Sequence, residues 1–293
     1  MSETLILLES TLTEGLFYAL LAYGIYITYR ILDFPDLTVD GSFPMGAAVT
    51  ALLITKGLNP YLTLPLAMGA GALAGLITGL IHVRLKVRDL LSGIITMTAL
   101  MSVNLVLAGS NQFFMDKETI FSLAPLGGLA LRERKLIVGL VLVILCKVLL
   151  DLYLKTKNGL LLRGTGDNAG FVTTLAKDSG RAKILGLVIA NAFVALAGSV
   201  VCQGQRSYSY TMGTGQMVFG LAAVLIGTTV FGRLHFVKGT TMALLGSVIY
   251  KFCIQGAIQL GLDANLMNLI TAALFLGILV LGRVVKKGGG KVA

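Results

Sequence analysis

The sequence predicts an all-α, polytopic membrane protein, and three features lead to that prediction. Of 293 residues, 56% are hydrophobic and 13% are charged, whereas soluble domains carry about 25% charged residues. The apolar residues gather in about eight to nine runs, each near the roughly 20 residues that a helix needs to cross a bilayer. The 36 glycines suit helices that approach closely in lipid. A helical bundle follows, because lipid leaves an open chain no other way to satisfy its backbone.

The runs follow one another with short polar connections, which predicts a single transmembrane domain over residues 1–293. One run is too short to cross comfortably, so some segments of the bundle are expected to be short or broken. In chain order the runs are Leu12–Leu32, Gly41–Thr55 (the short one), Tyr61–Val83, Leu90–Ala108, Leu136–Leu154, Ile184–Val201, Gln216–Phe231, Thr240–Ile258 and Leu266–Leu281.

Basic residues gather in alternate connections, which the positive-inside rule assigns to the cytoplasm. An even number of crossings separates these clusters, so a cytoplasmic C-terminus in a cell membrane is expected, with an acidic N-terminus outside. The net charge of +10 then reflects topology rather than nucleic-acid binding. The stretch Arg132–Lys135 opposes the rule, because it is basic on the predicted outer side. Leu12–Leu32 lacks the basic flank of a cleavable signal and is expected to remain a helix.

The two halves of the chain share short patterns at offsets near 171–175 residues. Gly46–Val49 is similar to Gly220–Val224, and Ala74-Gly75 to Leu245-Gly246. Under the predicted topology the halves run in opposite directions, which indicates an inverted repeat, a common way to build a transport path. Chance similarity among helices rich in glycine and alanine is the alternative.

The stretch Asp33–Pro44 carries several carboxylates and two prolines between apolar runs, so a break in the helix is predicted there. An ionisable residue at membrane depth is costly unless it faces a wet cavity or a partner. The candidate solute path therefore starts with Asp36 and Asp40, with the hydroxyls of Thr38 and Ser42 beside them. Solvated acids at an interface are the alternative.

Further path candidates lie in the polar loop before residue 216 and in the helices. A plain connecting loop, a docking surface for a binding protein and, for the mid-helix amides, helix–helix hydrogen bonds are the alternatives. The candidates are Asn104, Tyr208, Gln216 and Thr228.

The connection over about residues 155–183 is predicted to hold a short amphipathic helix on the cytoplasmic side. Asp167 or Asn168 suits its N-cap, and Phe171 and Leu175 would share one face. Such a helix lies on lipid or fits a partner's groove.

Gly159–Arg181 resembles the cytoplasmic coupling loop of permeases of the branched-chain amino acid and ribose importer family. The recurring arginine, acidic residue, small and apolar run and second arginine correspond to Arg163, Asp167, Ala169–Ala176 and Arg181, although Ala176 stands where glycine is usual. Asp36–Val39 resembles the pathway motif of the sugar branch, with Asp40 as an insertion. The resemblance covers nearly the whole chain.

This resemblance implies an importer with a second permease copy, likewise membrane-embedded, a cytoplasmic ATPase dimer and an extracellular solute-binding protein. ATP and magnesium would sit on the ATPase, since this chain has no phosphate loop, and the chain itself would hold no cofactor and be no enzyme. Contact with the ATPase would fall to Arg163, Asp167, Asn168, Phe171, Leu175 and Arg181. The solute would be small and polar, an amino acid by the coupling loop or a sugar or nucleoside by the pathway motif.

Two other classes of function remain open on sequence grounds. A secondary transporter would use the carboxylates of Asp36 and Asp40 with a proton or sodium gradient. An intramembrane hydrolase or transferase lacks a visible nucleophile–base pair, and the histidines lack metal-type spacing. Lys147 is expected to pair with Asp151 one turn on, while Lys251 either snorkels or faces a cavity.

Overall fold

The computed structural model describes residues 3–174, 178–232, 234 and 236–260, together with 269, 271–273, 276–277 and 280. Within this part, seven helices are long and apolar enough to cross a membrane, counting η1 with α1 and η2 with α8, and α2 is a shorter apolar helix. The prediction of an all-α polytopic protein is thereby confirmed. The predicted run Leu266–Leu281 lies mostly outside the described residues.

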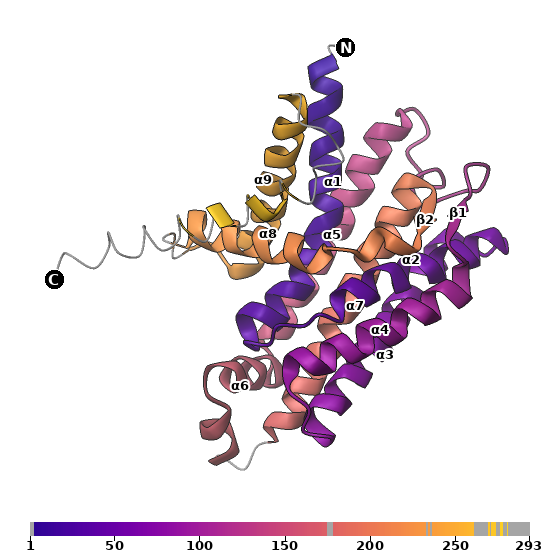
Figure 1. The fold of residues 1–293 in the computed structure, drawn as a ribbon. Helices are drawn as coiled ribbons and strands as arrows, with labels where there is room; N and C mark the ends of the chain where they lie inside the picture. Colours follow the sequence, from indigo (N-terminus) through magenta and orange to yellow (C-terminus); the bar gives the residue numbers. More distant parts are fainter. Residues whose placement is uncertain are drawn as a thin grey trace.

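Helices account for nearly all the described elements, and a single two-stranded ribbon joins two loops on the predicted outer side (Figure 1). The ribbon is antiparallel, with Asn111 opposite Ser209. In order, the elements are α1 (Glu3–Ile25), η1 (Tyr26–Ile31), α2 (Val39–Thr55), α3 (Pro60–Arg84), α4 (Asp89–Ala108), β1 (Asn111–Phe113), α5 (Leu131–Lys155), α6 (Lys157–Thr174), α7 (Ser179–Gln205), β2 (Ser207–Ser209), η2 (Tyr210–Gly213), α8 (Gln216–Phe231) and α9 (Gly239–Gln259).

The first membrane helix ends in a π-helical turn, η1, before the predicted break. There the amide of Leu32 donates to the carbonyl of Ile27 at 3.0 Å, a five-residue step, and Asp33 follows in the left-handed region at φ 52°. The break is shorter than predicted, because α2 begins at Val39 and contains Pro44. The helix tolerates that proline near its start, where the lost hydrogen bond would have been to the carbonyl of Asp40.

Helix α7 forms the centre of the bundle and is buried along most of its length. It runs parallel to α2, and the two are joined by hydroxyl contacts eight residues apart on each helix. Ser42 donates to the side chain of Asn191 at 2.6 Å, and Thr50 donates to Ser199 at 2.6 Å. Alanine and glycine fill the rest of this interface, so the backbones approach closely, as small residues allow in membrane helices.

The two halves of the chain exchange helices. Helix α1 packs mainly on α9, α7 and α5 and also contacts α8, whereas α7 packs mainly on α3, α2 and α1, and Figure 1 shows α1 beside α9. The paired glycines of the repeat both sit at such contacts: a Cβ on Gly46 would meet the carbonyl of Ala195 in α7, and one on Gly220 would meet Ile25 of α1. This reciprocal packing is what the predicted inverted repeat requires.

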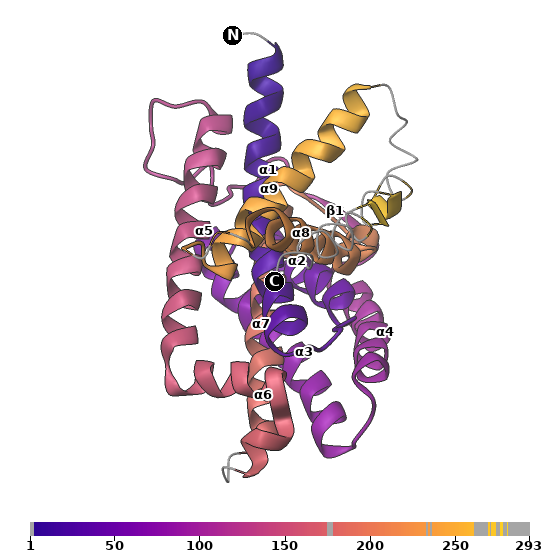
Figure 2. The same ribbon diagram turned by 90° about the vertical axis from the view of Figure 1, so that its left-hand side faces the viewer.

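Helix α6 lies across the bundle at the end opposite the N-terminus, and α5 runs along one side toward it (Figure 2). At the other end, the basic stretch that opposed the positive-inside rule is partly neutralised. The Nε of Arg132 lies 2.6 Å from a carboxylate oxygen of Glu9, and Lys135 donates to the carbonyl of Gly204 at 2.6 Å. These contacts weaken the objection to placing residues 132–135 outside.

Candidate transport site

A buried polar cluster joins the break to three helices. One carboxylate oxygen of Asp36 accepts the amide of Thr38 at 2.9 Å, and the other accepts the side-chain nitrogen of Asn191 at 2.8 Å. Asn191 in turn accepts from Ser42, and the hydroxyl of Thr38 lies 2.8 Å from that of Thr78 in α3. All five side chains are at most 2% exposed. The structure thus brings three predicted path residues together, in a cluster whose polar groups bind one another.

Asp40 connects the two short helices α2 and α8. It lies in the first turn of α2, and its carboxylate accepts the amide of Met217 at 2.7 Å and that of Gly215 at 3.2 Å. These amides lie at the start of α8, where the first N–H groups of a helix have no carbonyl acceptor within the helix. The negative charge also opposes the positive end of the helix dipole. The starts of the two short helices therefore meet at Asp40.

Three further predicted path residues lie close to this junction. Asn104 of α4 donates to the carbonyl of Gly41 at 3.0 Å, and the hydroxyl of Tyr208 donates to the backbone of Asn104 at 3.4 Å. Gln216, the first residue of α8, donates to Met212 at 2.9 Å. Burial raises the pKa of Tyr208 to about 12, so its hydroxyl keeps its proton and acts as a donor.

Two amide oxygens at the junction are left over. The buried Oδ1 of Asn104 and Oε1 of Gln216 accept no hydrogen bond from any protein group in the described part of the chain. A buried acceptor without a donor costs free energy, and such groups in a native fold commonly point to a water or ligand. These two oxygens can accept from the ammonium or hydroxyl groups of a polar solute.

Thr228 does not join this group. Its hydroxyl donates back to the carbonyl of Val224 at 2.9 Å, and it lies twelve residues beyond Gln216 along α8, which is about 18 Å at 1.5 Å per residue. The Thr228 hydroxyl is thus hydrogen-bonded to backbone carbonyls of its own helix, as is common for threonine in a helix.

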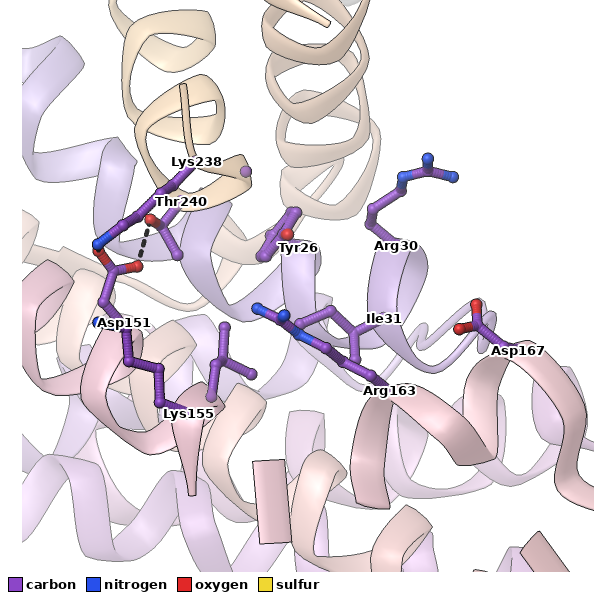
Figure 3. A pocket seen from close by; sticks show the side chains of 11 residues that line it. Tyr26, Arg30, Ile31, Asp151, Lys155, Arg163, Asp167, Lys238 and Thr240 are labelled. Atoms are coloured by element: carbon purple, nitrogen blue, oxygen red, sulfur yellow. Dashed lines mark hydrogen bonds and ion pairs between the residues drawn. The ribbon is translucent and has the colours of Figure 1, made fainter. Parts of the chain in front are cut away.

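The predicted coupling residues are spread over α6 and the start of α7. Arg163 and Asp167 line a cavity of about 520 Å³, in which Arg163 extends toward Tyr26 (Figure 3). Asn168 interrupts α6 with φ −159° and ψ 91°, so a second helical segment starts near the predicted cap. Arg181 pairs with Asp178 at 3.0 Å. The side chain of Phe171 and the whole of Leu175 lie outside the described residues.

A glycine brings α6 into contact with the membrane helices. A Cβ on Gly166 would clash with the carbonyl of Ile31 at the end of η1, so the two backbones touch there. The next residues, Leu32 and Asp33, lead into the break and then to Asp36. Movement of α6 can thus be passed directly to the segment that carries the buried polar cluster.

Sequence reasoning missed several contributors to this region. Asn191 of α7 donates to Asp36, which lies 155 positions away in the sequence. Lys251 pairs with Glu14 at 3.2 Å and lies 3.8 Å from the centre of the Tyr18 ring. No local spacing indicates either contact. Lys147 and Asp151 pair at 3.1 Å as expected.

The chain is similar in sequence to known transport permeases. The chain is 40% identical over 273 residues to a tyrosine transport system permease protein of Clostridioides difficile, covering 93% of this chain and 90% of the relative. It is 25% identical over 268 residues to a ribose import permease protein of Haemophilus influenzae, covering 90% and 80%. The overlap with a solved structure, PsaBC from Streptococcus pneumoniae in complex with Fab, is looser, with a TM-score of 0.42 and 13% identity over 83% of this chain and 88% of that one.

The match to a family model runs through almost every described helix. It extends over residues 7–282, from the second turn of α1 to beyond α9, and so includes the junction of α2 with α8 as well as α6. The chain belongs to the family described as branched-chain amino acid transport system, permease component.

Proposed function

We propose that this permease imports an amino acid through a path that passes the junction of α2 and α8, driven by separate ATPase subunits. The observation that carries the proposal is that both short helices begin at Asp40, inside the bundle, beside two buried amide oxygens without donors. Interrupted helices that meet within a bundle are a recurrent way to form a solute site.

The chemistry of the junction favours a solute with hydrogen-bond donors. The free oxygens of Asn104 and Gln216 accept hydrogen bonds, and an α-ammonium group supplies three donors. The relative from Clostridioides difficile is named a tyrosine transport permease, so tyrosine is the first solute to test. Sugars and nucleosides, which also carry donors, are the competing solutes.

Coupling to an ATPase is proposed to run through α6. This helix lies across one end of the bundle, and Gly166 touches η1 at Ile31. A partner that moves α6 would therefore move the break between η1 and α2. We propose an assembly of two permease copies, two cytoplasmic ATPase subunits and an extracellular solute-binding protein, with the C-terminus in the cytoplasm.

The test starts with gentle purification of the tagged chain from its native membrane and identification of the co-purifying proteins by mass spectrometry. The complex is then reconstituted in vesicles, and uptake of labelled tyrosine, leucine and ribose is measured with and without ATP. We expect a stoichiometric ATPase and ATP-dependent uptake of an amino acid. Asn104→Leu should lower that uptake at least tenfold, with little loss of ATPase recruitment.

Two results would contradict the proposal in different ways. Uptake by the chain alone that collapses with an ion gradient would indicate a secondary transporter. ATP-dependent uptake of ribose but of neither amino acid would keep the coupling and overturn the solute.

A further inference from the structure

The cavity beside α6 has a strongly basic lining. It is enclosed by the ends of η1 and α5, by α6 and by the start of α9, and its volume is about 520 Å³, within the range of about 300–1,000 Å³ for ligand sites. Four basic side chains reach it, Arg30, Lys155, Arg163 and Lys238, against two acidic ones, Asp151 and Asp167. Figure 3 shows Arg30 and Asp167 at one end and Asp151 with Lys238 at the other.

The basic groups that line the cavity outnumber the acidic ones, four against two. Asp151 is already occupied, since it accepts from Lys238 at 3.0 Å, from Lys147 at 3.1 Å and from Thr240 at 2.6 Å. Among the described residues, Arg30, Lys155 and Arg163 have no hydrogen-bond or ion-pair partner within the structure. Three unpaired cations around one cavity are suited to a multivalent anion, and above all to a phosphate group.

The position of the cavity favours a phosphate that belongs to a lipid. Arg30 and Lys155 stand at the ends of the membrane-crossing segments Thr4–Ile31 and Leu131–Lys155, where lipid headgroups lie. The same end of the molecule carries the basic connections and is predicted to be cytoplasmic. On α5, toward the bilayer centre, Leu145, Leu149 and Leu152 are each more than half exposed. Exposed leucines at this depth show that α5 has a face which lipid acyl chains can cover.

We propose that this cavity binds the phosphate headgroup of an anionic phospholipid of the cytoplasmic leaflet. Basic pockets between the ends of membrane helices bind such headgroups. Because the cavity is walled by both α6 and η1, a bound headgroup would bridge the helix that crosses the bundle and the helix that leads into the break.

The test uses the full chain purified in an uncharged detergent. Phosphatidylglycerol, phosphatidylcholine and inorganic phosphate are titrated separately, the shift in thermal unfolding is recorded, and native mass spectrometry counts the retained lipids. The variant Arg30→Gln with Lys155→Gln removes two cations from the cavity. The matched control, Arg84→Gln with Arg88→Gln, removes two exposed cations at the same end but outside the cavity.

We expect phosphatidylglycerol to stabilise the wild type and the control, and phosphatidylcholine to have no comparable effect. The cavity variant should bind phosphatidylglycerol about 20-fold or more weakly, from about fivefold for each charge removed. If the double variant does not fold, native mass spectrometry on Lys155→Gln alone should still show fewer retained phosphatidylglycerol molecules than on Arg84→Gln. Equal binding by the cavity and control variants would overturn the proposal, and so would full stabilisation by inorganic phosphate, which would indicate a site for a soluble anion.

Discussion

At the scale of single residues, Asn191 is the side chain on which the buried polar cluster depends. It donates to Asp36 and to the carbonyl of Leu187 and accepts from Ser42. Asn191→Leu would leave a fully buried carboxylate and a buried hydroxyl each short of one partner. We expect the free energy of unfolding to fall by about 3 kcal/mol, measured by chemical unfolding in detergent.

Two comparisons separate this effect from loss of packing. Ser199→Ala removes the other hydroxyl contact between α2 and α7 but should cost only about 1 kcal/mol, because Thr50 still donates to the carbonyl of Gly46 at 2.8 Å. In an Asp36→Asn background, Asn191→Leu should cost clearly less than in the wild type, since the stranded group is then neutral. An equal cost in both backgrounds would show that the carboxylate is not what Asn191 supports.

At the scale of elements, the start of α8 depends on a residue of α2. The carboxylate of Asp40 accepts two amides there, so Asp40→Ala removes both bonds and should destabilise the protein by about 1–2 kcal/mol. Asp40→Asn keeps one acceptor oxygen, so its free energy of unfolding should lie between those of the wild type and Asp40→Ala. Hydrogen exchange at residues 215–219 should speed up in the same order.

A control for the loss of charge is available on α4. Asp89 lies in the first turn of that helix, and its carboxylate accepts the amide of the next residue, Leu90, at 2.9 Å. Asp89→Asn should change stability by no more than about 0.5 kcal/mol. A loss as large as that of Asp40→Ala would mean that charge at a helix start, rather than the contact between α2 and α8, is the cause.

The contact between α6 and η1 is expected to couple solute uptake to ATP hydrolysis. Gly166→Ala pushes α6 away from the carbonyl of Ile31, so solute uptake per ATP hydrolysed should fall at least fivefold while the bundle stays folded. Gly164→Ala is the matched control, since its Cβ would meet only Val172 at an ordinary 3.4 Å. Uptake and hydrolysis are measured together in vesicles, and equal coupling in both variants would contradict the role of the contact.

The membrane helices could be predicted from the sequence, whereas most contacts between them could not. Apolar runs predicted the membrane helices, because the thickness of lipid fixes their length, and Pro35 with the nearby acids predicted the break. The start of α2 was misplaced, since Pro44 is tolerated where only the Asp40 carbonyl loses its bond. The contacts of Asp36 with Asn191, of Asp40 with the start of α8 and of Lys251 with Glu14 could not be predicted, because each joins residues distant in sequence and short-range spacing carries no information about them.

At the scale of the whole molecule, the exchange of α1 and α7 between the halves ties the bundle together. Each of these helices packs on the short helix of the opposite half, so neither half buries its own apolar faces alone. Such an arrangement can change shape by moving one exchanged unit against the other around the junction at Asp40. The direction of any transport then depends on which end of the bundle faces the cytoplasm.

Orientation can be tested with single cysteines in a background where Cys146, Cys202 and Cys253 are replaced by alanine. Lys117→Cys lies in the exposed loop after β1, and Lys86→Cys lies in the exposed connection between α3 and α4. The positive-inside rule predicts that a membrane-impermeant maleimide labels Lys117→Cys in intact cells but Lys86→Cys only after permeabilisation. The reverse pattern would place α6 outside the cell, where no cytoplasmic ATPase could reach it, and the proposed coupling through Gly166 would fail with it.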